Sequence, residues 1–559
     1  MHCTCSPFVS CGAACEVSGF AVIFAAQKMS GGAKVALTAA AVVVVVATLI
    51  NDFGVVLLVT PLVLGLVIFA MAQLPVRQSM QGLMFAALTM PNPNEGFPWR
   101  DIAERAQAGT GAWTAPFEKF GCVLLAHINI IDRSNGALTW CAFSGLDVLL
   151  VALGIIVYVR RSNGSRLDAR DTSPTPPPMN RLARISLLVT LFVWLTGMLR
   201  GGDFKNSLWQ VNSVVYLPIL YLLFQEGLRG PKDYAGLLKV LFFAATYRAL
   251  FATYVAHTFS ASTPDETGST RLPYASSHAD SMLFADAFVA VVVLFVERAA
   301  KKTKWRLAAL LPVFMLGMVS NNRRLVWVHV LIALGVLYAV TADNLVKRRI
   351  RKTLLLSSPA IVAYLITGWG SQFGSFYKPV RTLRTVLDAK SDSTGSSFWR
   401  ELENFDLVST LKENPIFGSG YGHPYLEVIR LPDIDYPLER YCPHNSILGV
   451  WAYGGLIGFA GVTMLWVAGV FFAMRAYRRA TDPEHRAAAL MSVTGILVYT
   501  MHCWGDLGLG TFTGVFTAAA SVAVAAKLAA ATGSWGAPAP GAKVRAEASS
   551  ASGAPARSV

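Results

Sequence analysis

Charged residues are scarce in this sequence. They make up 14% of the 559 residues, against 54% that are hydrophobic, whereas about a quarter of an average soluble protein is charged. Uninterrupted apolar runs near the length of a bilayer crossing recur along the chain, as in AKVALTAAAVVVVVATLI. Only helices or closed barrels satisfy their backbone polar groups inside a membrane, and these runs do not alternate as barrel strands do. The sequence therefore predicts an all-α polytopic integral membrane protein.

Hydropathy predicts about 13–14 transmembrane helices. The expected spans lie near residues 34–50, 54–73, 79–91, 142–159, 184–199, 208–226, 236–257, 280–297, 305–319, 325–341, 354–369, 446–473, 487–504 and 508–528. Lys and Arg concentrate in loops that alternation along the chain places on one side, and the positive-inside rule makes that side cytoplasmic. The net charge of +15 therefore reflects orientation and contact with anionic headgroups rather than nucleic-acid binding.

The pattern of apolar spans and basic loops also predicts how the chain is divided into segments. Residues 1–33 form an N-terminal segment whose first 28 residues are expected to precede a native start at Met29. The remaining parts are transmembrane helices in 34–369, with an outer loop at 92–141 and a Pro-rich cytoplasmic linker at 160–183, a periplasmic loop at 370–444, transmembrane helices in 445–528 and a disordered cytoplasmic tail at 529–559. No cleavable signal peptide is evident, so the first spans are expected to target the chain.

Metal ligands are also scarce. Four of the eight cysteines crowd the N-terminus as CTCSPFVSCGAAC, a spacing that fits no zinc site. The outer loops carry no Asp-x-Asp pair or carboxylate cluster, and Asp433 and Asp435 lie among prolines without further ligands. We therefore expect no metal and no cofactor. No internal repeat is visible either, which weighs against many transporter folds.

Four polar features fall on the predicted outer face. They are SNNRRL at 320–325, Arg400 in SSFWRELENF, the glycine-rich NPIFGSGYG at 414–422, and PHNSIL at the start of a span. Long loops in compact architectures are usually functional or disordered. The aromatic residues, prolines and helix-like stretch of the loop 370–444 indicate that it is ordered.

RELENFDLVSTLKENPIFGSGYG followed by HNSILGVWAYGGLIG resembles the O-antigen ligase and polymerase family of bacterial membrane glycosyltransferases. The resemblance covers about residues 320–460. It implies an all-helical glycosyltransferase fold of the C type, with a periplasmic loop over the site. It also implies a donor glycan on a polyprenyl (undecaprenyl) diphosphate, transferred to an acceptor hydroxyl in the biosynthesis of O-antigen, exopolysaccharide or capsule.

The resemblance gives the site residues their roles. His444 is expected to be the catalytic base, since imidazole titrates near neutrality. Arg324, Arg400 and Arg323 are expected to bind the diphosphate, because a guanidinium donates paired hydrogen bonds to phosphate oxygens; family position favours Arg324 over Arg323. The alternatives are that His444 and Asn445 only cap a helix and that the paired arginines only anchor a span end.

Other polar residues are possible supports for this site. Asn445 adjoins His444, and Arg200 lies with Lys205 in a short outer loop. Arg248 falls near the middle of a predicted span, where we expect it to meet Asp286 or to line the groove for the lipid carrier. For Arg200, Lys205 and Arg248 a structural role is as well supported as a functional one. His278 and Asp280, which enter a span from outside, have the same two alternatives.

The sequence thus predicts a glycosyltransferase of the bacterial inner membrane with its active site facing the periplasm. Expected partners are the polyprenyl-diphosphate-linked glycan, a glycan or lipid A-core acceptor, membrane lipids and other polysaccharide assembly proteins, with no nucleic acid. The main alternative is a transporter or flippase of lipid-linked saccharides, and a third is a structural assembly protein. Polymerase and ligase activities share the motif, and no residue identifies the acceptor.

Overall fold

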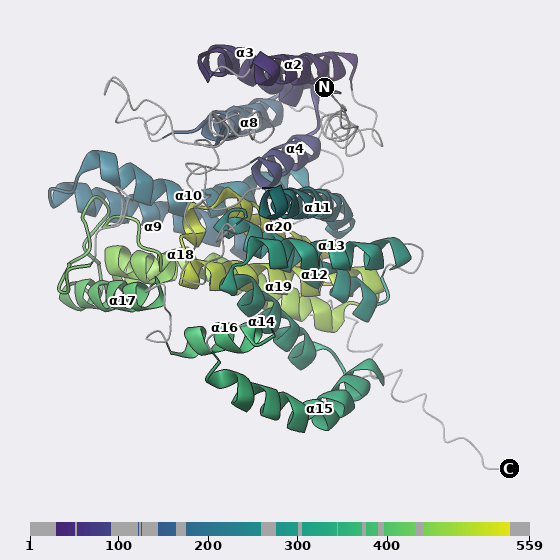
Figure 1. Cartoon of the computed structure of the whole chain (residues 1–559). Helices are drawn as coiled ribbons and strands as arrows, with labels where there is room; N and C mark the ends of the chain where they lie inside the picture. The colour runs from purple at the N-terminus through teal and green to yellow at the C-terminus, as the bar shows by residue number, and fades with distance from the viewer. Residues whose placement is uncertain are drawn as a thin grey trace, which may run out of the picture.

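The computed structural model is helical throughout the part that it describes (Figure 1). It describes residues 30–50, 53–90, 121, 124–125, 143–163, 175–258, 275–299, 304–343, 345–371, 376–388, 396–431 and 440–536. Each of the fourteen expected apolar segments coincides with a helix. Most of the predicted outer loop 92–141, much of the cytoplasmic linker, Met29, Asp433 and Asp435 lie outside the described residues.

Eight helices are long and apolar enough to cross a membrane, judged by length and composition. They are α9 (Pro177–Leu199), α10 (Phe204–Gly227), α11 (Tyr234–Thr258, preceded by the short helix η1, Pro231–Asp233), α12 (His278–Val296), α15 (Leu345–Trp369), α18 (Ser446–Arg479), α19 (Pro483–Gly505) and α20 (Phe512–Ala531). Shorter apolar segments lie in α2 (Gly31–Ile50), α3 (Phe53–Gln73), α13 (Lys304–Asn321) and α14 (Arg324–Val340). The other helices are α4 (Val76–Thr89), α8 (Gly145–Ser162), α16 (Lys378–Leu387), α17 (Ser396–Glu413) and η3 (Gly508–Gly510). The chain is thus a multi-pass membrane protein.

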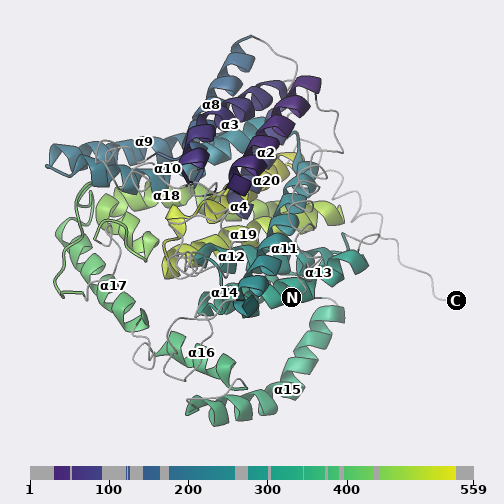
Figure 2. The same cartoon turned by 45° about the horizontal axis from the view of Figure 1, so that its top comes forward.

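The centre of the bundle is formed by α12, α19 and α20, most of whose residues are buried. The helix α20 is rich in Ala, and small residues let neighbouring backbones approach closely. It packs against α10, α18 and α19. Around this centre, α2, α3 and α8 lie at one side of the molecule, and α15 and α16 lie at the opposite side (Figures 1 and 2). No residue in the apolar window of α15 is buried, so this helix leaves large apolar side chains such as Leu355 and Ile366 exposed.

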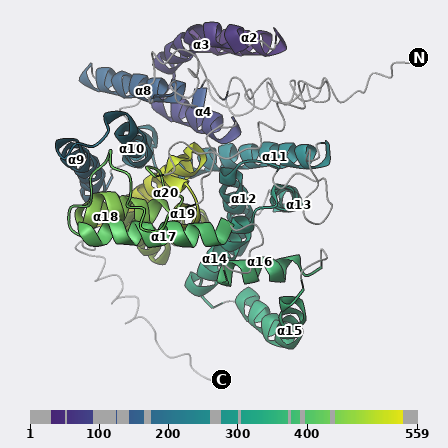
Figure 3. The ribbon, with the colours of Figure 1, turned by 60° about the vertical axis from the view of Figure 1, so that its left-hand side comes forward.

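The predicted periplasmic loop begins with the short helix α16 and continues with α17. Figure 3 shows α17 lying across the end of the bundle in front of α18, and the two helices are in contact. The starts of α12, α14 and α18 and the end of α19 meet at this end of the bundle, where His278 contacts Asp506 and Arg323, and Ser446 donates to the carbonyl of Asp506. The opposite end holds a cluster in which Arg486 binds Glu297 and Tyr477, so it joins α12, α18 and α19.

After α17, the glycine-rich turn at 414–422 passes between α9 and α18. Gly420 has φ +88°, and a Cβ there would lie 2.4 Å from the Cα of Gly197 on α9. The helix α18 is interrupted at Gly455, which has φ +56°, and the backbone N–H of Leu456 donates to the carbonyl of Pro415. Both glycines occupy backbone conformations that side chains disfavour. The glycines therefore allow the turn to approach α9 and the break in α18 closely.

We expect Gly420→Ala to destabilise the protein strongly. The positive φ alone costs about 1–2 kcal/mol for a residue with a Cβ, and the contact with Gly197 adds to this cost. Gly201→Ala is the matched control, because Gly201 has φ +87° but a Cβ added there would meet no atom within 4 Å. Thermal unfolding in detergent should show a lower Tm for both variants and a clearly larger fall for Gly420→Ala. Equal falls would show that the close approach to α9 is not important.

Candidate active site

His444, the expected catalytic base, lies between α17 and α18. The carboxylate of Glu403, which is buried in α17, accepts hydrogen bonds at 3.1 Å from the backbone N–H of His444. The same carboxylate lies 3.3 Å from Nδ1 of the His444 ring. Trp399, one turn earlier in α17, packs its ring edge-to-face against the imidazole at 4.9 Å. With Nδ1 facing a carboxylate, Nε2 is the ring nitrogen that can accept a proton.

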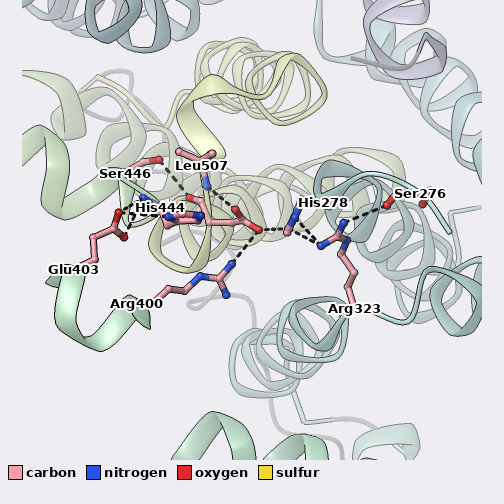
Figure 4. Close-up of polar contacts among 9 residues, drawn as sticks. Ser276, His278, Arg323, Arg400, Glu403, His444, Ser446 and Leu507 are labelled. Atoms are coloured by element: carbon pink, nitrogen blue, oxygen red, sulfur yellow. Dashed lines mark hydrogen bonds and ion pairs between the residues drawn. The ribbon is translucent and has the colours of Figure 1, made fainter. Parts of the chain in front are cut away.

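Asp506, just after the end of α19, is the centre of the second part of the site. Figure 4 labels His278, Arg323 and Arg400, the other members of this part. Its Oδ2 atom contacts Nδ1 of His278 and lies 3.8 Å from a guanidinium nitrogen of Arg400. The Nη1 atom of Arg323 lies 2.6 Å from Nε2 of His278. Arg323, His278, Asp506 and Arg400 thus form a continuous polar chain that joins α14, α12, α19 and α17.

The Asp506 carboxylate is ionised in this setting. Burial by itself would raise its pKa, but His278, Arg400 and His502 together hold the pKa of Asp506 well below its usual range. A carboxyl group with a lowered pKa stabilises the fold above its unfolded value of about 3.9 and loses that contribution as the pH falls through the folded value. Asp506 therefore remains an anion at neutral pH and in mild acid.

The three predicted arginines differ in exposure. Arg400 keeps 35% of its side chain exposed, and its 3.8 Å contact with Asp506 is longer than a hydrogen bond. Arg324 is half-buried, and its Nη1 atom lies 3.5 Å from Oγ of Ser397 on α17. Arg323 is only 5% exposed, so it does not extend toward headgroups as a span-end anchor would. Arg324 and Arg400 are thus more open to a ligand than Arg323.

The supporting residues lie in other contacts. Asn445 caps α18 by accepting from the backbone N–H of Leu448, as the alternative interpretation predicts. Arg200 donates to the carbonyl of Gly418 at 2.7 Å and so supports the glycine turn.

The predicted contact of Arg248 with Asp286 is wrong. Arg248 makes two hydrogen bonds, at 2.8 and 2.7 Å, to the buried carboxylate of Asp280. Asp280 lies in the first turn of α12 and so at the depth that Arg248 of α11 reaches, whereas Asp286 lies almost two turns farther into the bundle.

Two residues of the site were not found from the sequence. Glu403 follows Arg400 by three positions, which places both on one face of a helix, but the sequence does not show that this face meets His444. Asp506 ends a span in WGDLGLG, and an isolated acid beside a basic outer face is the signal that could have drawn attention to it. Among the described residues, no group of three or more His, Cys, Asp or Glu side chains is arranged to hold a metal ion.

Comparisons with known proteins support the resemblance. Residues 307–463 match the model of a family described as O-antigen ligase. The chain is also 25% identical over 338 residues to an O-antigen ligase of Salmonella typhimurium, covering 58% of this chain and 76% of that protein. The matched region contains Arg323, Arg324, Arg400, Glu403 and His444. The predicted resemblance to the O-antigen ligase family is therefore confirmed, and it implies a glycosyltransferase-type enzyme.

Proposed function

Proceeding from this similarity to the O-antigen ligases, we propose that the protein transfers a glycan from a polyprenyl diphosphate to an acceptor hydroxyl at the periplasmic face of the inner membrane. The observation that carries the proposal is the meeting of a carboxylate-bound histidine and two accessible arginines at one end of the bundle. These groups come from α14, α17 and the start of α18. A transfer of this kind needs a proton acceptor for the hydroxyl and positive charge for the leaving diphosphate.

In the proposed step, the acceptor oxygen attacks the anomeric carbon of the donor sugar. The bond from this carbon to the diphosphate oxygen breaks, and the lipid diphosphate leaves with the electron pair. The hydroxyl proton passes to Nε2 of His444. Glu403 holds the imidazole in the tautomer that carries its proton on Nδ1 and stabilises the imidazolium that forms.

The diphosphate gains negative charge as it leaves. Arg400 and Arg324 are assigned to bind it, since a guanidinium donates paired, charge-assisted hydrogen bonds to phosphate oxygens. The long contact between Arg400 and Asp506 lets the guanidinium turn toward phosphate without breaking a short ion pair. Arg323 is assigned a positioning role, because it lies behind His278 and acts on the site through His278 and Asp506.

The similarity to an O-antigen ligase favours ligation of a glycan onto a lipid acceptor over polymerisation. A transporter or flippase is less well supported, because transporters usually place their binding groups near the bilayer midplane. Here the histidine and the arginines lie at helix ends. Membrane lipids surround the enzyme, and other polysaccharide assembly proteins are expected to deliver the donor.

The test is the gel profile of surface polysaccharide from the host strain with this gene removed. We expect bare lipid A-core at the surface, with long chains retained on the lipid carrier. Surface lipid with a single repeat and no ladder would instead identify a polymerase. An unchanged profile, with other secreted polysaccharides intact, would contradict the proposal.

A further inference from the structure

A second polar feature lies deeper in the bundle, apart from the site at its outer end. It is a cavity between α4, α11, α12, α19 and α20, with about 80 Å³ of space for water-sized molecules. One acidic side chain, Asp286, lines it together with the hydroxyl residues Tyr234, Ser492, Thr494, Thr517 and Ser521, and the other described lining residues are apolar or glycine. Asp286 follows His278 by eight residues of α12, so the cavity lies about 12 Å inward of the site.

Asp286 is a carboxylate without a local partner. It is 7% exposed, and neither of its oxygens has a hydrogen-bond partner among the described residues. The nearest candidate from the sequence, Arg248, is bound to Asp280 instead. Ionisable residues inside a membrane protein usually face a cavity or a partner and mark a functional position. A carboxylate that faces a cavity therefore needs an occupant that can donate to it or carry positive charge.

Three of the hydroxyl groups that line the cavity already donate their protons to backbone carbonyls. Ser492 donates to the carbonyl of Ala488, Thr494 to that of Leu490, and Thr517 to those of Thr513 and Gly514. A hydroxyl oxygen that donates its proton still has lone pairs with which to accept. The cavity therefore presents a carboxylate and several acceptor oxygens, and no Lys, Arg or His is found among the described residues that line it.

From this arrangement we infer that the cavity binds a sodium ion, with Asp286 and the hydroxyl oxygens of Ser492, Thr494 and Thr517 as direct or water-bridged ligands. A single carboxylate balances one positive charge, whereas calcium sites in proteins usually combine several carboxylates. The volume exceeds what one water molecule needs, so an ion and bridging waters fit together. The bound ion links α12, α19 and α20, the helices that form the centre of the bundle.

The test is the thermal stability of the purified full-length protein in detergent. Unfolding is followed by tryptophan fluorescence in sodium chloride and in choline chloride at equal ionic strength and pH. We expect sodium to raise the Tm by about 2 °C or more, because a ligand that binds only the folded state stabilises it. Asp286→Asn should lose this sodium-dependent shift. Asp343→Asn, a control at an exposed carboxylate bound by Arg351, should retain it.

Thr517→Val provides a second variant that keeps the carboxylate. It should raise the sodium concentration needed for a given Tm shift by about tenfold, as expected for the loss of roughly 1.4 kcal/mol from one ligand. Equal Tm values of the wild-type protein in the two salts would overturn the inference. So would a sodium shift that persists in Asp286→Asn, or a Tm that follows pH but not sodium, since a proton alone would then occupy the site.

Discussion

His444→Gln is expected to lower the rate of glycan transfer by about 10²- to 10⁴-fold, the range typical of general acid–base catalysis. Glutamine retains the backbone N–H that donates to Glu403, and its amide can still donate to the same carboxylate. It cannot take up the hydroxyl proton, so the loss should fall on kcat and leave KM for the donor nearly unchanged. The measurement is the initial rate of transfer from a polyprenyl-diphosphate-linked glycan by the purified enzyme.

Two further variants make this result specific. His485→Gln removes a histidine at the opposite end of the bundle, near Asp482 of the loop before α19, and should leave the rate unchanged. Glu403→Gln should reduce kcat less than His444→Gln does, since it removes the charge that stabilises the imidazolium but keeps the histidine. If His444→Gln retained full activity, His444 would be only a residue that precedes the α18 cap.

Arg400→Ala is expected to lower kcat by about 10²- to 10³-fold. This is the loss typically seen when a group that stabilises charge in the transition state is removed. The charge on the diphosphate grows as the sugar bond breaks, so Arg400 acts mainly on the reaction step. Arg400→Lys should recover only part of the rate, because an ammonium cannot reproduce the paired hydrogen bonds of a guanidinium. Arg430→Ala, at an exposed arginine of the same loop, is the control and should keep the wild-type rate.

A structural role for Arg400 gives a different result. If Arg400 served only to balance Asp506, removal of both charges in Arg400→Ala/Asp506→Asn would restore activity along with stability. A double-mutant cycle with Tm and kcat measured in parallel separates the two roles. We expect the double variant to recover part of the Tm that Arg400→Ala loses, while kcat stays low. Recovery of kcat would show that Arg400 does not act on the diphosphate.

The local features of the chain could be predicted well. The fourteen apolar segments coincide with helices because the length of an apolar run is a property of neighbouring residues. The glycine-rich turn could be recognised for the same reason, since backbone conformations with positive φ favour glycine. The order and spacing of RELENFDLVSTLKENPIFGSGYG and HNSILGVWAYGGLIG were enough to indicate the resemblance to the O-antigen ligase family, which the comparisons support.

The long-range pairs could not be predicted in this way. Glu403 meets His444 across 41 residues, and Asp506 lies just after α19 while its partner His278 lies in α12. The partner of Arg248 also depends on depth in the membrane, which differs by nearly two turns between Asp280 and Asp286. Each contact depends on which helix faces pack together, and that packing is determined by many side chains at once.

The sequence by itself therefore determined the helices, the membrane class and the residue types that gather at the end of the bundle that holds His444, because these follow from local hydropathy and spacing. Only the tertiary structure decided which carboxylate orients His444, which arginines remain accessible and which acid lacks a partner. The physical reason is that hydrogen bonds and ion pairs form over about 3 Å. A contact of that length is fixed only when distant helices have packed.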